Sequence, residues 1–119
     1  MIDEQFRLEV LDWIANDPDS ETASLLAKWL SENNEIELRK SFSGFLEFGT
    51  AGLRGPVRPG PSGMNRAVVG RTAAGIAAFL ISRGLSKVVI GRDARHGSTE
   101  FLQESAKILS GAGLDVHLL

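Results

Sequence analysis

The last third of this 119-residue chain alternates between strand-like and helix-like segments. A short β-branched run at 87–91 is followed by a helical pattern at 98–110, and a second apolar run occupies 116–119. A strand, a helix and a strand within about 30 residues form a βαβ unit, in which the strands are parallel and the crossover is right-handed. The sequence therefore predicts an α/β fold, with a mixed or parallel sheet flanked by helices. We expect the strand at 87–91 to be buried, because it is short, β-branched and bounded by turn residues.

Glycine divides the chain into two parts. Of the 13 glycines, only Gly44 precedes residue 49. The first part is acidic and poor in glycine, whereas the second is rich in glycine and contains short apolar runs, with a helix expected at 65–83. We therefore expect a helical N-terminal extension at 1–43 and an α/β domain at 44–119.

Apolar spacing predicts the helices of the first part. Phe6, Val10 and Trp13 recur at three- and four-residue intervals, which places them in one stripe on a helix. A large aromatic side chain in such a stripe is typical of a core or an interface. We therefore expect Trp13 and Trp29 to be packed against other apolar residues.

The dipeptide Asp17–Pro18 predicts a break between two helices. Asp is a favourable N-cap, and Pro is favoured at the first helical position, so we expect Asp17 to cap the second helix. That helix is expected to end near 33–34, and a third, short helix is expected at 36–42.

Composition and charge exclude several classes of protein. The 13 Lys and Arg against 15 Asp and Glu give a net charge of -2, whereas a nucleic-acid binder is expected to be basic. Without cysteine, the chain has no disulfide scaffold, thiolate zinc site or cysteine nucleophile. No apolar run approaches the roughly 18 residues of a membrane span, and the first residues are acidic where a signal peptide is basic. We expect a cytoplasmic protein with neither a nucleic-acid nor a membrane partner.

The first segment that could carry chemistry is Phe-Gly-Thr-Ala-Gly-Leu-Arg-Gly at 48–55. Its glycines allow backbone N–H groups to turn toward one point, as in an anion-binding nest. Arg54 adds a forked array of donors suited to phosphate oxygens, and Thr50 can donate a further hydrogen bond. The segment matches neither a Walker loop nor a dinucleotide fingerprint. The composition of this segment is also compatible with a tight turn that connects two elements and binds no ligand.

The second segment is Gly-Arg-Asp-Ala-Arg-His-Gly-Ser at 91–98, directly after the predicted strand. Ligands of open α/β sheets bind beyond the carboxyl ends of strands, which is where this segment lies. Arg92, Arg95 and His96 supply positive or switchable charge. Asp93 either takes part in anion binding or forms an ion pair with an arginine that stabilises the segment, and the second interpretation is favoured.

The chain offers no local nucleophile. It contains no GxSxG elbow, no glycosidase-like carboxylate pair and no HExxH or other metal-ligand cluster. Two positive, Gly-rich segments without a nucleophile predict that this chain binds an anion while the reacting group lies elsewhere.

The motif at 48–55 resembles the first signature of the α-D-phosphohexomutase superfamily, the phosphoglucomutases and phosphomannomutases. Val-Ile-Gly-Arg-Asp-Ala-Arg at 89–95 resembles the strand and loop that follow that signature, with a helix between them. The resemblance runs from about Trp13 to the last residue. The helical front end and the Ala51 variant of the signature are most similar to the phosphoglucomutase-2 and phosphopentomutase branch.

This resemblance implies the first domain of a four-domain mutase that moves a phosphoryl group between C1 and C6 (or C5) of a sugar phosphate through a phosphoserine. It implies Mg²⁺ at the serine, a sugar bisphosphate activator, and the remaining domains of the same protein as partners. Arg54 would stabilise the transferring phosphoryl group. The other implied positions shape or support the active-site loops: Thr50, Gly52, Arg92 and Arg95 at the phosphate, and Gly49, Gly55 and Asp93 as structural support.

The departure from the family is large, since the Thr-Ala-Ser-His-Asn-Pro loop that carries the serine is absent. The metal loop, the sugar-recognition loop and the C-terminal phosphate loop are absent as well. We therefore predict no nucleophile and no metal ligand in these 119 residues, which alone should be inactive. Two alternatives remain open: a stand-alone module that binds an anion or phosphosugar without catalysis, and a structural protein whose front helices form an interface.

Overall fold

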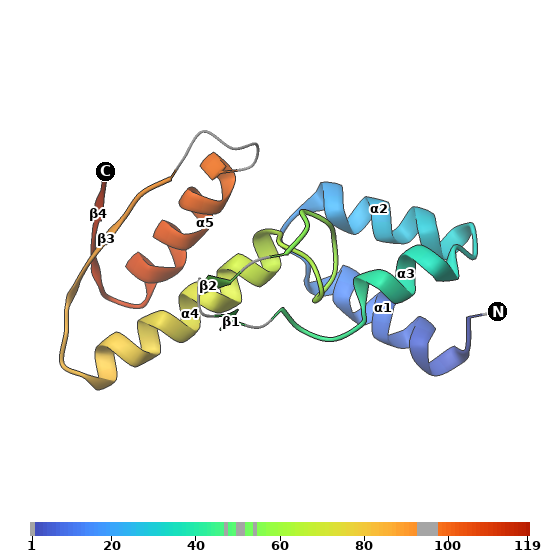
Figure 1. Ribbon diagram of the computed structural model, residues 1–119, viewed down its shortest axis with the longest axis horizontal. Coiled ribbons are helices and arrows are strands. Elements are labelled where there is room, and N and C mark those ends of the chain that lie inside the picture. The colour runs from blue at the N-terminus through green and yellow to red at the C-terminus, as the bar shows by residue number, and fades with distance from the viewer. Residues whose placement is uncertain (1, 47, 50–51, 54, 93–97) are drawn as a thin grey trace. The chain divides into compact units, whose positions relative to one another are not determined.

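The computed structural model describes residues 2–46, 48–49, 52–53, 55–92 and 98–119. The chain forms two compact units, Met1–Val68 and Val69–Leu119, and each is considered by itself. Together the elements make a mixed α/β fold with a small parallel sheet (Figure 1). This confirms the predicted class. The predicted boundary between 43 and 44 remains a prediction.

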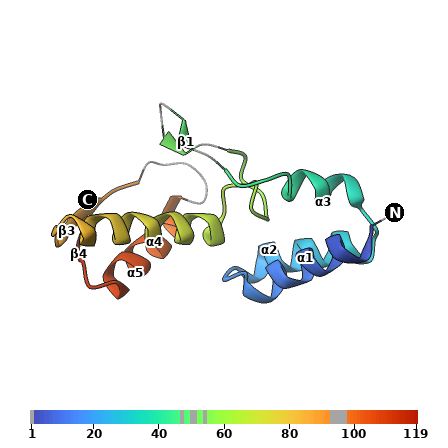
Figure 2. The same ribbon diagram turned by 90° about the horizontal axis from the view of Figure 1, so that it is seen from below.

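Three helices form the core of the first unit. They are α1 (Glu4–Asn16), α2 (Ser20–Ser31) and α3 (Glu35–Ser41), and α1 and α2 lie side by side (Figures 1 and 2). The core consists of five buried residues, with Trp13, Trp29 and Phe42 packed against them, as predicted for the two tryptophans. The buried residues are Phe6, Val10, Leu26, Leu30 and Leu38.

The expected N-cap of α2 was wrong by two residues. Asp19 caps this helix, and its carboxylate accepts a hydrogen bond from the Glu21 N–H at 2.9 Å. Asp17 precedes a proline and is extended, so it ends α1. Its carboxylate instead accepts from the Asp19 N–H at 2.9 Å and the Thr22 hydroxyl at 2.6 Å. Pro18 therefore lies between the helices.

The Gly-rich segment, expected to be a loop, contains a small antiparallel hairpin. Its strands are β1 (Phe48–Gly49) and β2 (Gly52–Leu53), with Phe48 opposite Leu53 and Gly49 opposite Gly52. The hairpin is followed by an irregular segment at 55–65, which leads into helix α4 (Arg66–Ser82).

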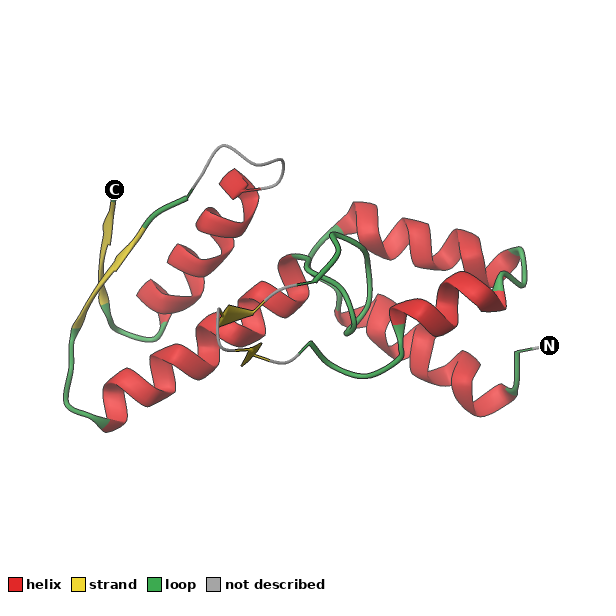
Figure 3. Cartoon of the chain, in the orientation of Figure 1, coloured by secondary structure: helices red, strands yellow, loops and turns green. Residues whose placement is uncertain are grey.

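The second unit contains the predicted βαβ arrangement. Strands β3 (Lys87–Ile90) and β4 (Asp115–Leu118) are parallel, with Val88 opposite Val116, and α5 (Ser98–Gly111) connects them (Figure 3). Gly84, at a φ of 72°, follows α4 as expected, because this left-handed conformation favours glycine. The core combines α4, α5 and one face of the sheet: Ala73, Ala77, Leu109 and Leu114, packed by Leu80, Val88, Ile90, Ile108 and Val116.

The expectation that the strand at 87–91 is buried was wrong, because only alternate residues of β3 are covered. Val88 and Ile90 face the helices, whereas Val89 is 60% exposed. The burial alternates along β3 because α4 and α5 cover the same face of the two-stranded sheet. In the described part of the chain, no helix is long and apolar enough to cross a membrane.

Candidate functional site

The hairpin contains four of the five described residues of the motif at 48–55, all except Gly55. Gly49 and Gly52 are paired across it, so neither strand carries a Cβ at that position. Backbone without side chains can approach a bound anion closely. Thr50 and Arg54, the two side chains predicted to act on a phosphate, lie outside the described residues, and so does Ala51.

Gly55 ends the motif in an exposed position. A Cβ at this position would lie 2.6 Å from Cδ2 of Leu46. Because that atom is the end of a flexible side chain, the contact alone does not make glycine obligatory. The predicted structural role of Gly55 therefore stays a prediction.

The irregular segment after the hairpin is held by the buried side chain of Asn65. Its Nδ2 donates to the carbonyls of Arg58 and Gly60, both at 2.8 Å, and its Oδ1 accepts from the Val68 N–H at 3.0 Å. Asn65 therefore caps α4 and closes the segment with one amide group. The sequence contained a signal for this residue, since Asn is a favourable N-cap directly before a helical pattern.

Arg58 attaches the same segment to α3. Its Nη2 lies 2.9 Å from Oε2 of Glu37 and 3.1 Å from Oγ of Ser41, which is fully buried. The contacts of Arg58 with Glu37 and Ser41 were not predicted, because no local pattern joins residues that are about 20 positions apart. The available signal was one arginine, Arg58, within a Pro- and Gly-rich segment.

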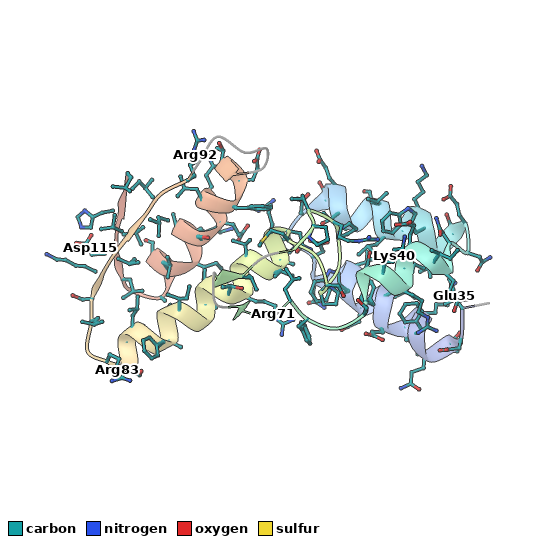
Figure 4. The ribbon with its side chains drawn as sticks, viewed as in Figure 1. Glu35, Lys40, Arg71, Arg83, Arg92 and Asp115 are labelled. Carbon is teal, nitrogen blue, oxygen red and sulfur yellow. The ribbon has the colours of Figure 1, made fainter. Side chains whose placement is uncertain are left out.

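The second predicted segment begins directly after β3 in the other unit. Arg92 is exposed and lies where the described part of this segment ends (Figure 4). Asp93, Arg95 and His96 lie outside the described residues. The two Gly-rich segments belong to different units, and the anion binding predicted from them stays a prediction.

A metal site was tested on the side chains that the structure describes. Among these residues, no three Asp, Glu or His side chains lie close enough together to hold an ion. The described side chains therefore do not form a Mg²⁺ site.

The sequence comparisons decide the family. Residues 46–119 match the profile of "Phosphoglucomutase/phosphomannomutase, alpha/beta/alpha domain I". This matched region contains both Gly-rich segments of the chain. The chain belongs to this family. Its match begins within the first unit, after α3, so the three N-terminal helices lie outside the matched region.

Curated relatives extend the similarity into the helical part. The chain is 36% identical over 107 residues to the phosphoglucomutase of Staphylococcus aureus strain USA300, and 35% identical over 107 residues to that of strain MRSA252. Each match covers 89% of this chain and 19% of the relative. The chain thus spans about a fifth of the length of these relatives. No solved structure matches it.

Proposed function

We propose that this chain is the N-terminal part of a phosphosugar mutase of the phosphoglucomutase and phosphomannomutase type. The observation that carries the proposal is the motif at 48–55, which lies inside the region that matches domain I. The resemblance of the motifs implies a parent protein of four domains, and the chain spans 19% of the length of the Staphylococcus aureus phosphoglucomutase. The front helices and Ala51 favour the phosphoglucomutase-2 and phosphopentomutase branch.

The parent enzyme would move a phosphoryl group between C1 and C6 of a hexose phosphate, or C5 of a pentose phosphate. A phosphoserine outside these residues gives its phosphoryl group to the free hydroxyl of the sugar phosphate. The resulting bisphosphate then returns its other phosphoryl group to the serine, so the sugar leaves with its phosphate moved. A sugar bisphosphate activator would maintain the phosphorylated serine.

In this proposal Arg54 acts on the phosphoryl group in transfer. The transition state of phosphoryl transfer is loose and spreads charge over the equatorial oxygens, which a fixed guanidinium can stabilise. The facing glycines Gly49 and Gly52 let the backbone approach the phosphate, and Thr50 donates a hydrogen bond. Arg92 and Arg95, with Asp93, support the serine loop from the end of β3.

Mg²⁺ bound at the serine would stabilise the negative charge of the phosphoryl oxygens. Its ligands would belong to the later domains.

The proposal is tested with Arg54→Ala in the protein at its native length. Turnover of glucose 1-phosphate, mannose 1-phosphate and a pentose 1-phosphate is measured with Mg²⁺ and a sugar bisphosphate. We expect the kcat for the accepted substrate to fall roughly 10²-fold, because one preorganised charge is lost at the transition state. Arg7→Ala, which removes an exposed arginine from α1, is the matched control and should keep full activity.

Two results would contradict this proposal. Wild-type turnover by the Arg54→Ala variant would remove Arg54 from the mechanism. Binding of sugar phosphates without turnover of any of them by the unmodified protein would instead favour the non-catalytic binding module.

A further inference from the structure

Both ends of the motif hairpin are attached to the same irregular segment at 56–64. Before the motif, the Leu46 N–H donates to the Pro61 carbonyl at 3.2 Å. After the motif, the Pro56 carbonyl accepts from the Met64 N–H at 2.8 Å, next to a bridge between Val57 and Met64. Any displacement of the segment at 56–64 therefore moves both flanks of the hairpin.

The segment is itself attached to the end of α3. The Ser62 N–H donates to the Ser41 carbonyl at 3.0 Å, and the Ser62 hydroxyl donates to the Gly44 carbonyl at 2.7 Å. Gly60, at a φ of 88°, lies so close to Ser41 that a Cβ on Gly60 would be 2.5 Å from the Ser41 carbonyl oxygen. These contacts place the turn of the segment directly on the last residue of α3.

Arg58 adds the side-chain part of this attachment. Its guanidinium reaches the Glu37 carboxylate at 2.9 Å, the Glu37 carbonyl at 3.2 Å and the Ser41 hydroxyl at 3.1 Å. Its Cζ also lies 5.8 Å from the centre of the Trp29 ring on α2. The side chains of Arg58 and Glu37 are only 20% and 34% exposed, so the pair is poorly screened by solvent. Nε and Nη2 of Arg58 therefore both donate to residues of α3.

We propose that Arg58 is a positioning residue for the motif hairpin, and that α2 and α3 serve as its scaffold. Arg58 fixes the segment at 56–64 and, through it, both flanks of the motif at 48–55, to which Arg54 belongs. This inference rests on the proposed function, because the catalytic consequence depends on Arg54 acting on the phosphoryl group. It gives a role at the site to helices that lie outside the matched domain.

The test compares Arg58→Met with Lys40→Met in the protein at its native length. Lys40 is the matched control, because it also pairs with Glu37, at 3.7 Å, but is 58% exposed and lies on the surface of α3 (Figure 4). We expect Arg58→Met to lower kcat roughly 10- to 100-fold with KM changed less than about twofold, since small misplacements of a catalytic group have effects of this size. Lys40→Met should leave both constants unchanged. Arg58→Lys keeps the charge but not the forked geometry, and it should restore only part of kcat.

A double-mutant cycle separates positioning from general loss of structure. If Arg58 acts through Arg54, Arg58→Met should lower kcat no further in an Arg54→Ala background. A full additional loss in that background would overturn the positioning role.

Amide hydrogen exchange of the peptide covering 56–64 tests the attachment without any activity. Arg58→Met should speed its exchange at least tenfold relative to Lys40→Met, because the segment loses the side-chain contacts that hold it against α3, where the Ser41 carbonyl accepts from the Ser62 N–H. Unchanged exchange would overturn the inference even if the mutase activity is confirmed. Faster exchange in a protein with no mutase activity would refute the proposed function and the catalytic role, while the attachment itself would stand.

Discussion

Replacing Asn65 with alanine removes the one side chain that both closes the segment at 56–64 and caps α4. Asn65 is only 4% exposed, and its amide makes three hydrogen bonds of 3.0 Å or less. Loss of the capping bond costs about 1 kcal/mol, and loss of the bonds to the Arg58 and Gly60 carbonyls costs about 1 kcal/mol each. We therefore expect Asn65→Ala to lower the free energy of unfolding by about 3 kcal/mol.

Urea denaturation followed by tryptophan fluorescence is the suitable assay. Trp13 and Trp29 both pack on the core of the first unit, so their emission reports the unfolding of that unit. Asn65 belongs to the same unit. Asn65→Ser keeps a capping oxygen but loses the amide donors, and it should cost about 2 kcal/mol. Asn16→Ala is the matched control, because Asn16 makes one exposed hydrogen bond, to the Asp12 carbonyl. It should cost less than about 0.5 kcal/mol.

The comparison has a clear refuting result. If Asn65→Ala and Asn16→Ala destabilise the unit equally, the Asn65 amide does not hold the segment.

Three further predictions concern packing, backbone conformation and activity. Leu26→Ala should lower the free energy of unfolding by about 3 kcal/mol because Leu26 is fully buried, whereas Leu8→Ala, at a 55% exposed position, should cost less than about 1 kcal/mol in the same urea assay. Gly60→Ala should cost about 2 kcal/mol more than Gly84→Ala by denaturation, since both residues have positive φ but only Gly60 abuts the Ser41 oxygen; equal costs would contradict the close approach. The 119-residue chain alone should show no mutase activity in a coupled assay, because no residue matches the serine motif; turnover above the blank would refute this.

Local patterns predicted the elements well. The helices expected at 36–42, 65–83 and 98–110 agree with α3, α4 and α5 to within one residue at each end, and the predicted stripe of Phe6, Val10 and Trp13 lies on α1. Capping was harder to predict, since Asp17 and Asp19 are both favourable caps and the proline after Asp17 decides between them.

Properties that depend on distant parts of the chain could not be predicted. The exposure of Val89 depends on which faces of the sheet are covered, and a strand sequence does not contain that information. The contact of Arg58 with Glu37 joins residues 21 positions apart and has no local signature. The motif predicted Arg54 and Thr50 as site residues, and their roles remain proposals because both lie outside the described part of the chain.

The most direct test of the central claim is the intact mass of the protein purified from its source, with and without phosphatase treatment. A phosphosugar mutase that works through a phosphoserine should have a mass several times 12.8 kDa, and phosphatase should lower it by one phosphate. A mass near 12.8 kDa that phosphatase does not change would contradict the mutase proposal and favour a binding domain without catalysis.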